Sequence, residues 1–321
     1  MHRASLLAVV LLGASASAYA QTDQDFEFGS ANDLVSLRPP FVSVDTLDPH
    51  GYSRFHLTTR GAFSDPVDVQ RETVRWAFEL STALRLTDGL AIVAALPFGA
   101  YAPKPGVNEF FIGNFKLGLA GGFDVALPGD PRSRNRPHLT FGFGFDVYAP
   151  TAPEVPRAIG FALEAPTDPM HAIASIRSYD PELYVTRLMT FRPRFQAGVS
   201  VNVFTGLVEL SLAPAFTAQR DAEFLMMFHW LVHLAVQPVS AIEPYLQLGN
   251  TIAVTGEAAG VDLTQPVQLT IGARGHFGPV SPALFLAIDL AEGLPIVGID
   301  LAGILYRQER GVARGDDDLG F

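Results

Sequence analysis

Strict alternation of side chains in one short stretch constrains the fold more than any other feature. The stretch from His138 to Thr151 reads "HLTFGFGFDVYAPT". Its large apolar residues share one parity: Leu139, Phe141, Phe143, Phe145 and Val147. Its small and polar residues share the other: Thr140, Gly142, Gly144, Asp146 and Tyr148. Because successive side chains of a strand point to opposite faces, the stretch predicts either a soluble sandwich that buries the phenylalanines or a membrane barrel that turns them towards lipid.

The same alternation recurs along most of the chain. Further segments with period two are 74–86, 90–98, 111–127, 195–203, 208–216, 224–234, 242–254, 267–277, 284–290 and 296–305. Many of them reach the length of a tilted strand that crosses a bilayer, about nine residues or more, whereas strands of soluble sheets average about five or six. The chain is 48% apolar and only 17% charged. After the N-terminus, however, it has no apolar run as long as the roughly 18 residues of a spanning helix. A membrane protein of this composition would have to cross with strands.

The face opposite the large apolar residues distinguishes the barrel from the sandwich. It is made of Gly, Ala, Ser and Thr with isolated charges of both signs: Arg54, Arg60, Arg75, Glu79, Arg85, Lys116, Asp124, Asp146, Glu209, Glu243 and Arg274. Such a face suits a confined interior in which side chains must fit and pair. We therefore predict an all-β fold, a single antiparallel transmembrane β-barrel. A two-sheet protein with internal ion pairs is the alternative.

The number of strands is predicted from parity and from the rule that bacterial single-chain barrels have an even count. About thirteen candidate strands lie between residues 52 and 306. Because the count should be even, we predict about 12 strands, with 14 as the alternative. The weakest candidates are 183–191 and the final pair around 291–295. Short connectors are expected at "TDG", "FRPRF" and "AQRDAE". The longest connector, 149–180, contains five prolines and is predicted to be an outer loop that covers the mouth of the barrel.

The ends of the chain predict export. Residues 1–20 have a short basic start, the apolar run "LLAVVLLGA" and the small-residue pattern "AYA" before Gln21, which is typical of a cleaved signal peptide. Residues 21–50 are interpreted as an N-terminal periplasmic segment, 51–307 as the barrel and 308–321 as an acidic C-terminal tail. The predicted location is the outer membrane, with membrane lipid as a partner.

Several function classes are disfavoured by composition and motifs. A formal charge of −11 disfavours nucleic acid as a partner, and the absence of cysteine excludes thiol chemistry. We find no phosphate-binding loop, dinucleotide fingerprint or zinc spacing. His229 and His233 would lie about 13 Å apart along a strand, too far to bind one ion. No metal and no cofactor is expected.

Three stretches resemble a known group of membrane barrels. They are "FELSTALRLTDGLAIVAALPFGAY", "IGNFKLGLAGGFDVAL" and "DVYAPT", and they are similar to outer-membrane barrels of the phenol-degradation MetA-pathway type and to the barrel region of some OmpA-like proteins. Those families show a "GD-L-LG-K" motif, where this chain has Asn114 in place of Asp, and an "LPTG" motif, where 149–152 lacks the Gly. The resemblance covers about 76–151 and implies a channel or transporter whose substrate the family leaves open.

Candidate functional residues are those expected on the lumen face. Arg75, Glu79, Arg85, Lys116 and Asp124 would form either a charged constriction or a salt-bridged plug that closes the barrel. Further candidates for solute contact are Asp146, Met227, His229, Leu231, His233 and Arg274. The inward Leu225, Met227 and Leu231 would make an apolar patch that favours hydrophobic over sugar-like solutes.

These residues predict a passive channel for small amphipathic or aromatic molecules, and not an enzyme. A closed structural or docking barrel is one alternative. An outer-membrane lipid hydrolase is another, and it would use Ser200 with His229 or His276. The oligomeric state is left open by the sequence.

Overall fold

The structure is a computed structural model that describes residues 53–64, 73–87, 89–103, 109–128, 137–152, 173–174, 176–177, 179–185, 187–217, 224–239, 241–255, 264–277, 280–291, 293 and 295–306. The predicted signal peptide, N-terminal segment and acidic tail lie outside the described residues. Within the described residues, no helix has the length and apolarity needed to cross a membrane.

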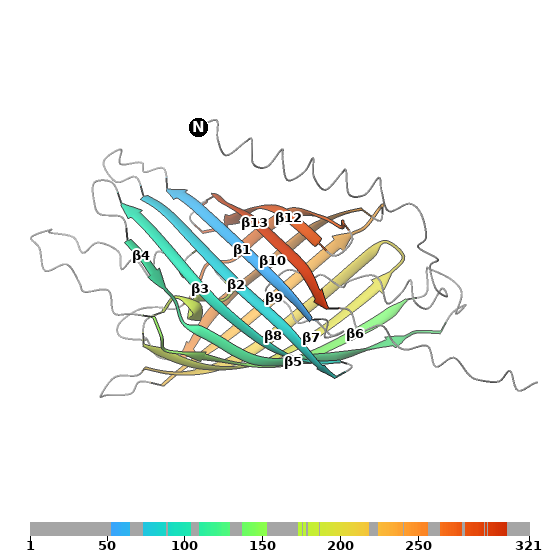
Figure 1. Cartoon of the computed structure of the whole chain (residues 1–321), viewed down its shortest axis with the longest axis horizontal. Helices are drawn as coiled ribbons and strands as arrows, with labels where there is room; N and C mark the ends of the chain where they lie inside the picture. The colour runs from blue at the N-terminus through green and yellow to red at the C-terminus, as the bar shows by residue number, and fades with distance from the viewer. Residues whose placement is uncertain are drawn as a thin grey trace, which may run out of the picture.

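Thirteen strands and one short 3-10 helix make up the described fold (Figure 1). The strands are β1 (Ser53–Ser64), β2 (Thr73–Thr87), β3 (Leu90–Pro103), β4 (Glu109–Ile112), β5 (Phe115–Ala126), β6 (His138–Ala149), β7 (Leu188–Val201), β8 (Phe204–Thr217), β9 (Phe224–Val236), β10 (Ile242–Thr255), β11 (Gln268–Gly275), β12 (Val280–Asp289) and β13 (Pro295–Tyr306). The helix, η1, spans Pro181–Leu183.

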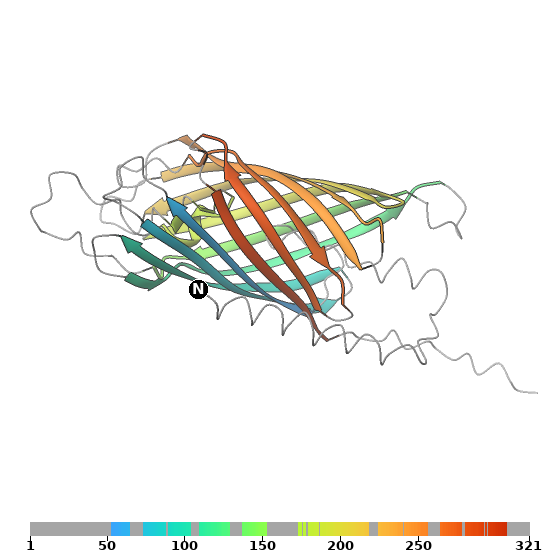
Figure 2. The ribbon, with the colours of Figure 1, turned by 90° about the horizontal axis from the view of Figure 1, so that it is seen from above.

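The sheet closes on itself. From β5 to β13 each strand pairs with the next one in the chain, β3 pairs with β2, β4 and β5, and β1 pairs antiparallel with both β2 and β13. In Figures 1 and 2 the near and far strands run in crossing directions, as the tilted strands of a closed barrel do. Closure leaves no second sheet, so the sandwich alternative is excluded.

Strands β4 and β5 are two halves of one barrel strand. Both pair with β3, β4 at Phe98–Tyr101 and β5 at Leu90–Ala95. The interruption between them is Gly113 and Asn114. The barrel therefore has twelve strands around its circumference, which confirms the predicted count and the antiparallel fold.

One predicted connector is wrong, and it accounts for the surplus candidate strand. "FRPRF" was expected as a turn, but it lies inside β7, and Leu183 belongs to η1. Alternation continues through the proline, with Pro193 exposed on the outer face and Arg192 and Arg194 buried on the inner face. A proline has no N–H for the ladder, which agrees with the gap in the pairing of β7 with β8 between Thr190 and Arg194.

The two faces of the barrel differ sharply in polarity. On β6, Phe143 and Phe145 are 51% and 45% exposed on the outside, while Asp146 and Tyr148 are buried on the inside. Exposed large apolar side chains continue around the ring as far as Val297 on β13. An apolar surface of this extent requires an apolar surrounding. The phenylalanine face of the opening stretch therefore lies where lipid tails would contact the barrel.

The connectors at the two ends differ in length. One end has the connectors 88–89, 127–137, 202–203, 237–241 and 276–279. The other end has 65–72, 104–108, 150–187, 218–223, 256–267 and 290–294. In outer-membrane barrels the longer connectors lie on the extracellular side, so we assign the second end as the outer mouth.

Candidate functional site

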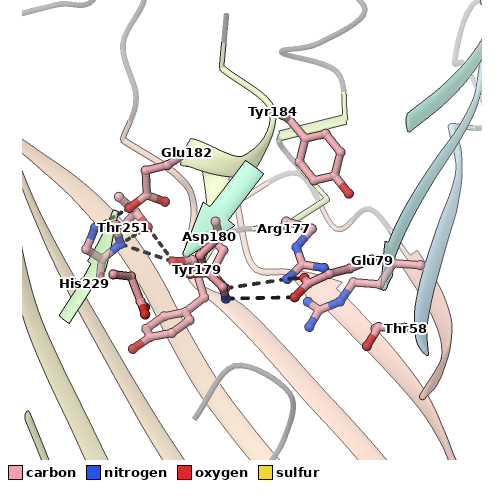
Figure 3. Close-up of polar contacts among 12 residues, drawn as sticks. Thr58, Glu79, Arg177, Tyr179, Asp180, Glu182, Tyr184, His229 and Thr251 are labelled. Carbon is pink, nitrogen blue, oxygen red and sulfur yellow. Dashed lines mark hydrogen bonds and ion pairs between the residues drawn. The ribbon is translucent and has the colours of Figure 1, made fainter. Parts of the chain in front are cut away.

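The end of the longest connector folds into the barrel. We call residues 173–185 the in-folded segment; its described residues are 173–174, 176–177 and 179–185, and all are buried. Side chains of this segment contact β2, β7, β8 and β9, and the backbone carbonyl of Tyr179 accepts from Thr251 on β10 (Figure 3). These strands span more than half of the ring, so the segment lies within the lumen. The described end of the connector lies inside the barrel. The prediction that the connector covers the mouth concerns 153–172, which lie outside the described residues.

The interruption between β4 and β5 holds the backbone of the segment. The Asn114 side chain donates from Nδ2 to the carbonyl oxygens of Glu182 at 2.7 Å and Val185 at 2.6 Å. Its backbone N–H donates to the carbonyl oxygen of Leu183 at 2.6 Å. A Cβ on Gly113 would lie 2.2 Å from that same oxygen, so glycine permits the approach. A carboxylate at position 114, as in the resembling families, could not donate these bonds.

Arg192 binds the acidic part of the segment. Its guanidinium forms ion pairs with Asp180 and, at 3.7 Å, with Glu182. It also donates to the Ser211 hydroxyl at 3.0 Å and the Tyr148 hydroxyl at 3.3 Å. Among the described residues, both ion-pair partners of this fully buried arginine lie on the in-folded segment.

Two further groups complete the contact with the acidic part. His229 Nε2 lies 2.9 Å from Glu182 Oε1, and its Nδ1 lies 2.8 Å from the Thr251 hydroxyl. The ring of Tyr179 packs against the Arg192 guanidinium at 4.4 Å.

Burial by itself raises the pKa of the Asp180 carboxyl, but the neighbouring Arg192 guanidinium lowers that pKa below its ordinary value. The carboxylate therefore stays ionised at neutral pH.

The basic residue of the segment binds the other side of the wall. Arg177 lies 2.6 Å from Glu79 on β2, and Glu79 also lies 3.9 Å from Lys116 on β5. Figure 3 shows Arg177 and Asp180 side by side between the two walls. The segment is thus held on one side by the wall carboxylate of Glu79 and on the other by the wall guanidinium of Arg192.

Wall charges on three adjacent strands, β6 to β8, lie beside these contacts. Arg194 lies 2.9 Å from Asp146 and 3.3 Å from Glu209. The Tyr179 hydroxyl donates to Glu209 at 2.6 Å. The Tyr184 hydroxyl is within hydrogen-bond distance of the Phe78 and Phe98 carbonyl oxygens, at 3.0 and 3.2 Å. Buried polar groups in the lumen are therefore satisfied largely by the segment and by one another.

The structure brings together some of the predicted site residues and separates others. Glu79 and Lys116 join the network around the segment, as do Asp146 and His229. The other three residues of the predicted charged constriction do not join the pair: Arg75 and Arg85 are half-buried, and Asp124 is exposed and accepts a hydrogen bond from Thr140.

The predicted apolar and histidine positions all face inward. Met227, Leu231 and His233 are buried on the inner face of β9. Met227 belongs to the same buried apolar cluster as Ile173 and Ile176 of the segment. The apolar patch is therefore covered.

Arg274 belongs to a different part of the wall, formed by β1 and β10–β13. It lies 3.2 Å from Asp300 and 3.9 Å from Glu243. With Arg60 and Tyr245 it lines a small cavity. No cluster suited to a metal ion occurs among the described residues.

Sequence reasoning missed the residues that hold the segment. Arg192, Arg194 and the acids Asp180 and Glu182 were not proposed as functional. The available signal was the parity of β7: a strand read through "FRPRF" puts both arginines on the inner face. The acids lie in a connector without periodic pattern, and nothing in their local sequence indicates an inward course.

The pairing of Ser200 with His229 or His276 that a hydrolase would need is not found among the described residues. In the described part of the chain, Ser200 hydrogen-bonds Thr205, and His229 binds Glu182. His276 lies instead between Ser281, at 3.4 Å from its Nδ1, and Glu243, at 3.4 Å from its Nε2. Only 4% of Ser281 is exposed, which leaves little room for a substrate at its hydroxyl.

The comparisons with known proteins agree with this architecture. No protein-family model matches the chain, and no curated protein sequence matches it. The COG4313 outer membrane channel from Pseudomonas putida F1 is similar in structure, with a TM-score of 0.53 at 12% identity over 82% of this chain and 98% of that chain.

Two further solved barrels match more distantly. The NanC porin has a TM-score of 0.41 at 8% identity, over 77% of this chain and 97% of that one. The translocator domain of the autotransporter NalP from Neisseria meningitidis has a TM-score of 0.37 at 12% identity, over 84% and 91%. The resemblance expected from the sequence motifs is confirmed at the level of fold, because the chain shares the barrel fold of the COG4313 outer membrane channel.

Proposed function

We propose that the protein is an outer-membrane channel for small amphipathic molecules, held closed in this structure by the in-folded segment. The observation that carries the proposal is the pairing of the lumen charges. The inner wall presents Arg192 and Glu79 to a connector segment that β-barrel closure does not require. A barrel built only for stability would satisfy such charges within its own wall, because an ion pair to a separate segment also costs the conformational entropy that the segment loses when it is ordered.

The solute class follows from what the segment covers. The segment forms ion pairs with charged groups of the wall and shares a buried apolar cluster with Leu225 and Met227. Withdrawal of the segment would expose a polar and an apolar surface next to each other, which suits a molecule with one polar end. The apolar part of such a molecule would bind by burial, worth about 25 cal/mol per Å².

Solute entry into liposomes tests this function. Liposomes that contain the protein should admit benzoate faster than sucrose, a larger solute without an apolar face. Met227→Asp should reduce that preference because it places a charge in the apolar part of the lumen. Ser200→Ala is the matched control and should leave the preference unchanged. Equal entry of both solutes, or entry of neither when 153–185 are deleted from a folded barrel, would favour the closed structural barrel.

The location belongs to the same proposal. The mature chain should begin at Gln21, fractionate with the outer membrane and migrate faster on a gel unboiled than boiled, as folded barrels often do. Recovery of the protein in the soluble periplasm would contradict the proposal, because an apolar outer face requires lipid.

A further inference from the structure

We propose that Arg192 is the binding site for the carboxylate of a solute, and that the in-folded segment occupies this site as a built-in substitute. This inference rests on the proposed function and names the solute as an amphipathic monocarboxylate. It starts from a fully buried guanidinium whose two ion-pair partners, Asp180 and Glu182, lie on a connector rather than on the barrel wall.

The wall around Arg192 is already arranged for a carboxylate. The Ser211 hydroxyl at 3.0 Å and the Tyr148 hydroxyl at 3.3 Å hold the guanidinium in place. A planar guanidinium with a fixed orientation matches the geometry of a carboxylate. Without an anion, a buried cation at this position would be strongly unfavourable.

The neighbouring wall charges do not compete for this role. Arg194 is paired with Asp146 and Glu209, and Lys116 with Glu79. The segment itself carries one arginine and two acids between residues 173 and 185, which gives a net charge of −1. A monocarboxylate would therefore restore the charge that the segment supplies.

The apolar end of the solute has a defined place on the same wall. The register of β7 and β8 pairs Thr190 with Ala215 and Arg194 with Ser211, which puts Arg192 beside Ala213. Ala213 in turn pairs with Met227 on β9. Arg192, Ala213 and Met227 are all buried on the inner face, and two strand spacings separate the first from the last by about 10 Å.

This row has a cation at one end, a small residue in the middle and a flexible apolar side chain at the other end. A carboxylate with a short alkyl tail would fit along it, with the tail over Ala213 and its end at Met227. The segment places its own groups comparably, with its acids at Arg192 and its Ile173 and Ile176 in the apolar cluster that contains Met227.

Binding of hexanoate to the full-length protein in detergent, measured by calorimetry, tests the inference. The double variant Asp180→Asn, Glu182→Gln keeps the shape of the segment and removes both carboxylates that occupy Arg192. It should bind hexanoate at least tenfold more tightly than the wild type does. Hexanamide, the neutral analogue, should bind weakly and equally to both proteins.

Two variants on this double background identify the anion site. Arg192→Gln should reduce hexanoate affinity to that of hexanamide. The matched control is Arg60→Gln, which removes a lumen arginine that donates to Gln268 and lies over Phe285 on another part of the wall; it should retain the affinity. Tyr148→Phe keeps every charge and should weaken hexanoate severalfold, which covers the case in which Arg192→Gln does not fold.

Three results would overturn the proposal. They are equal hexanoate affinity of the wild type and the double variant, hexanoate binding that survives Arg192→Gln, and hexanamide binding to the double variant as tightly as hexanoate. Calorimetry needs no conduction. A conducting protein without Arg192-dependent binding would therefore refute the carboxylate site alone, whereas a folded barrel that binds hexanoate but never conducts would refute the channel.

Discussion

Replacing Asn114 by Asp should release the in-folded segment. The change removes the two N–H bonds that Nδ2 donates to the carbonyl oxygens of Glu182 and Val185, and it places a negative oxygen against two acceptors. Leaving a buried carbonyl group without its donor costs about 1–2 kcal/mol, so the two together cost about 2–4 kcal/mol. The ratio of withdrawn to in-folded segment should rise by roughly 30- to 700-fold, since about 1.4 kcal/mol corresponds to a factor of ten.

The absence of native cysteine makes this change measurable by thiol labelling. A single cysteine introduced by Ala174→Cys, at a position with no exposed surface, should react with a membrane-impermeant maleimide only when the segment withdraws. The reaction should be at least about 30-fold faster in the Asn114→Asp background. Asn250→Asp changes another buried asparagine, on the outward-facing parity of β10, whose amide donates to the Gln265 carbonyl; it is the control and should leave the rate near that of the wild type. Equal rates in all three proteins would refute the assignment of Asn114 as an anchor.

Three further predictions test other parts of the account. Phe143→Arg puts a charge against lipid and should lower the free energy of unfolding in lipid vesicles by roughly 2–4 kcal/mol near the midplane, whereas Gly144→Ser on the inner face should lower it much less; the reverse ranking would exchange the inside and outside of the barrel. Glu79→Gln removes the carboxylate that binds Arg177 at 2.6 Å and should speed labelling of Ala174→Cys, while Asp124→Asn, outside that network, should not; an unchanged rate in Glu79→Gln would show that this pair does not hold the segment. Purified protein should hydrolyse a p-nitrophenyl ester at the background rate, with Ser281→Ala indistinguishable from the wild type; a rate that falls in Ser281→Ala would instead support a hydrolase.

The barrel was predictable from sequence because the alternation of side chains along each strand shows which face of that strand contacts lipid and which faces the lumen. A strand such as 138–149 carries its lipid face and its inner face in alternate residues, and the closed ring of β1 to β13 follows from repeating that pattern. The same parity placed Glu79, Lys116, Asp146, Met227 and His229 on the inner face correctly. The one large error on a strand came from treating a proline as a break.

The partners of those inner residues were not predictable, because they come from a segment without period. Asp180 and Glu182 lie in a Pro-rich connector, and only the three-dimensional structure shows that it bends inward. Asn114 is an instructive case. Its departure from the Asp of the resembling families was visible in the sequence, but its role as a double donor becomes clear only beside the carbonyl groups of Glu182 and Val185.

Single-channel recording in a planar bilayer tests the central claim most directly. The wild-type protein should be closed for most of the time, because the segment fills the lumen. The Asp180→Asn, Glu182→Gln variant should show discrete and much more frequent openings, since the ion pairs to Arg192 and His229 that hold the segment are lost. A folded double variant that remains silent, with its segment shown by labelling to be withdrawn, would contradict the account and identify a closed structural barrel.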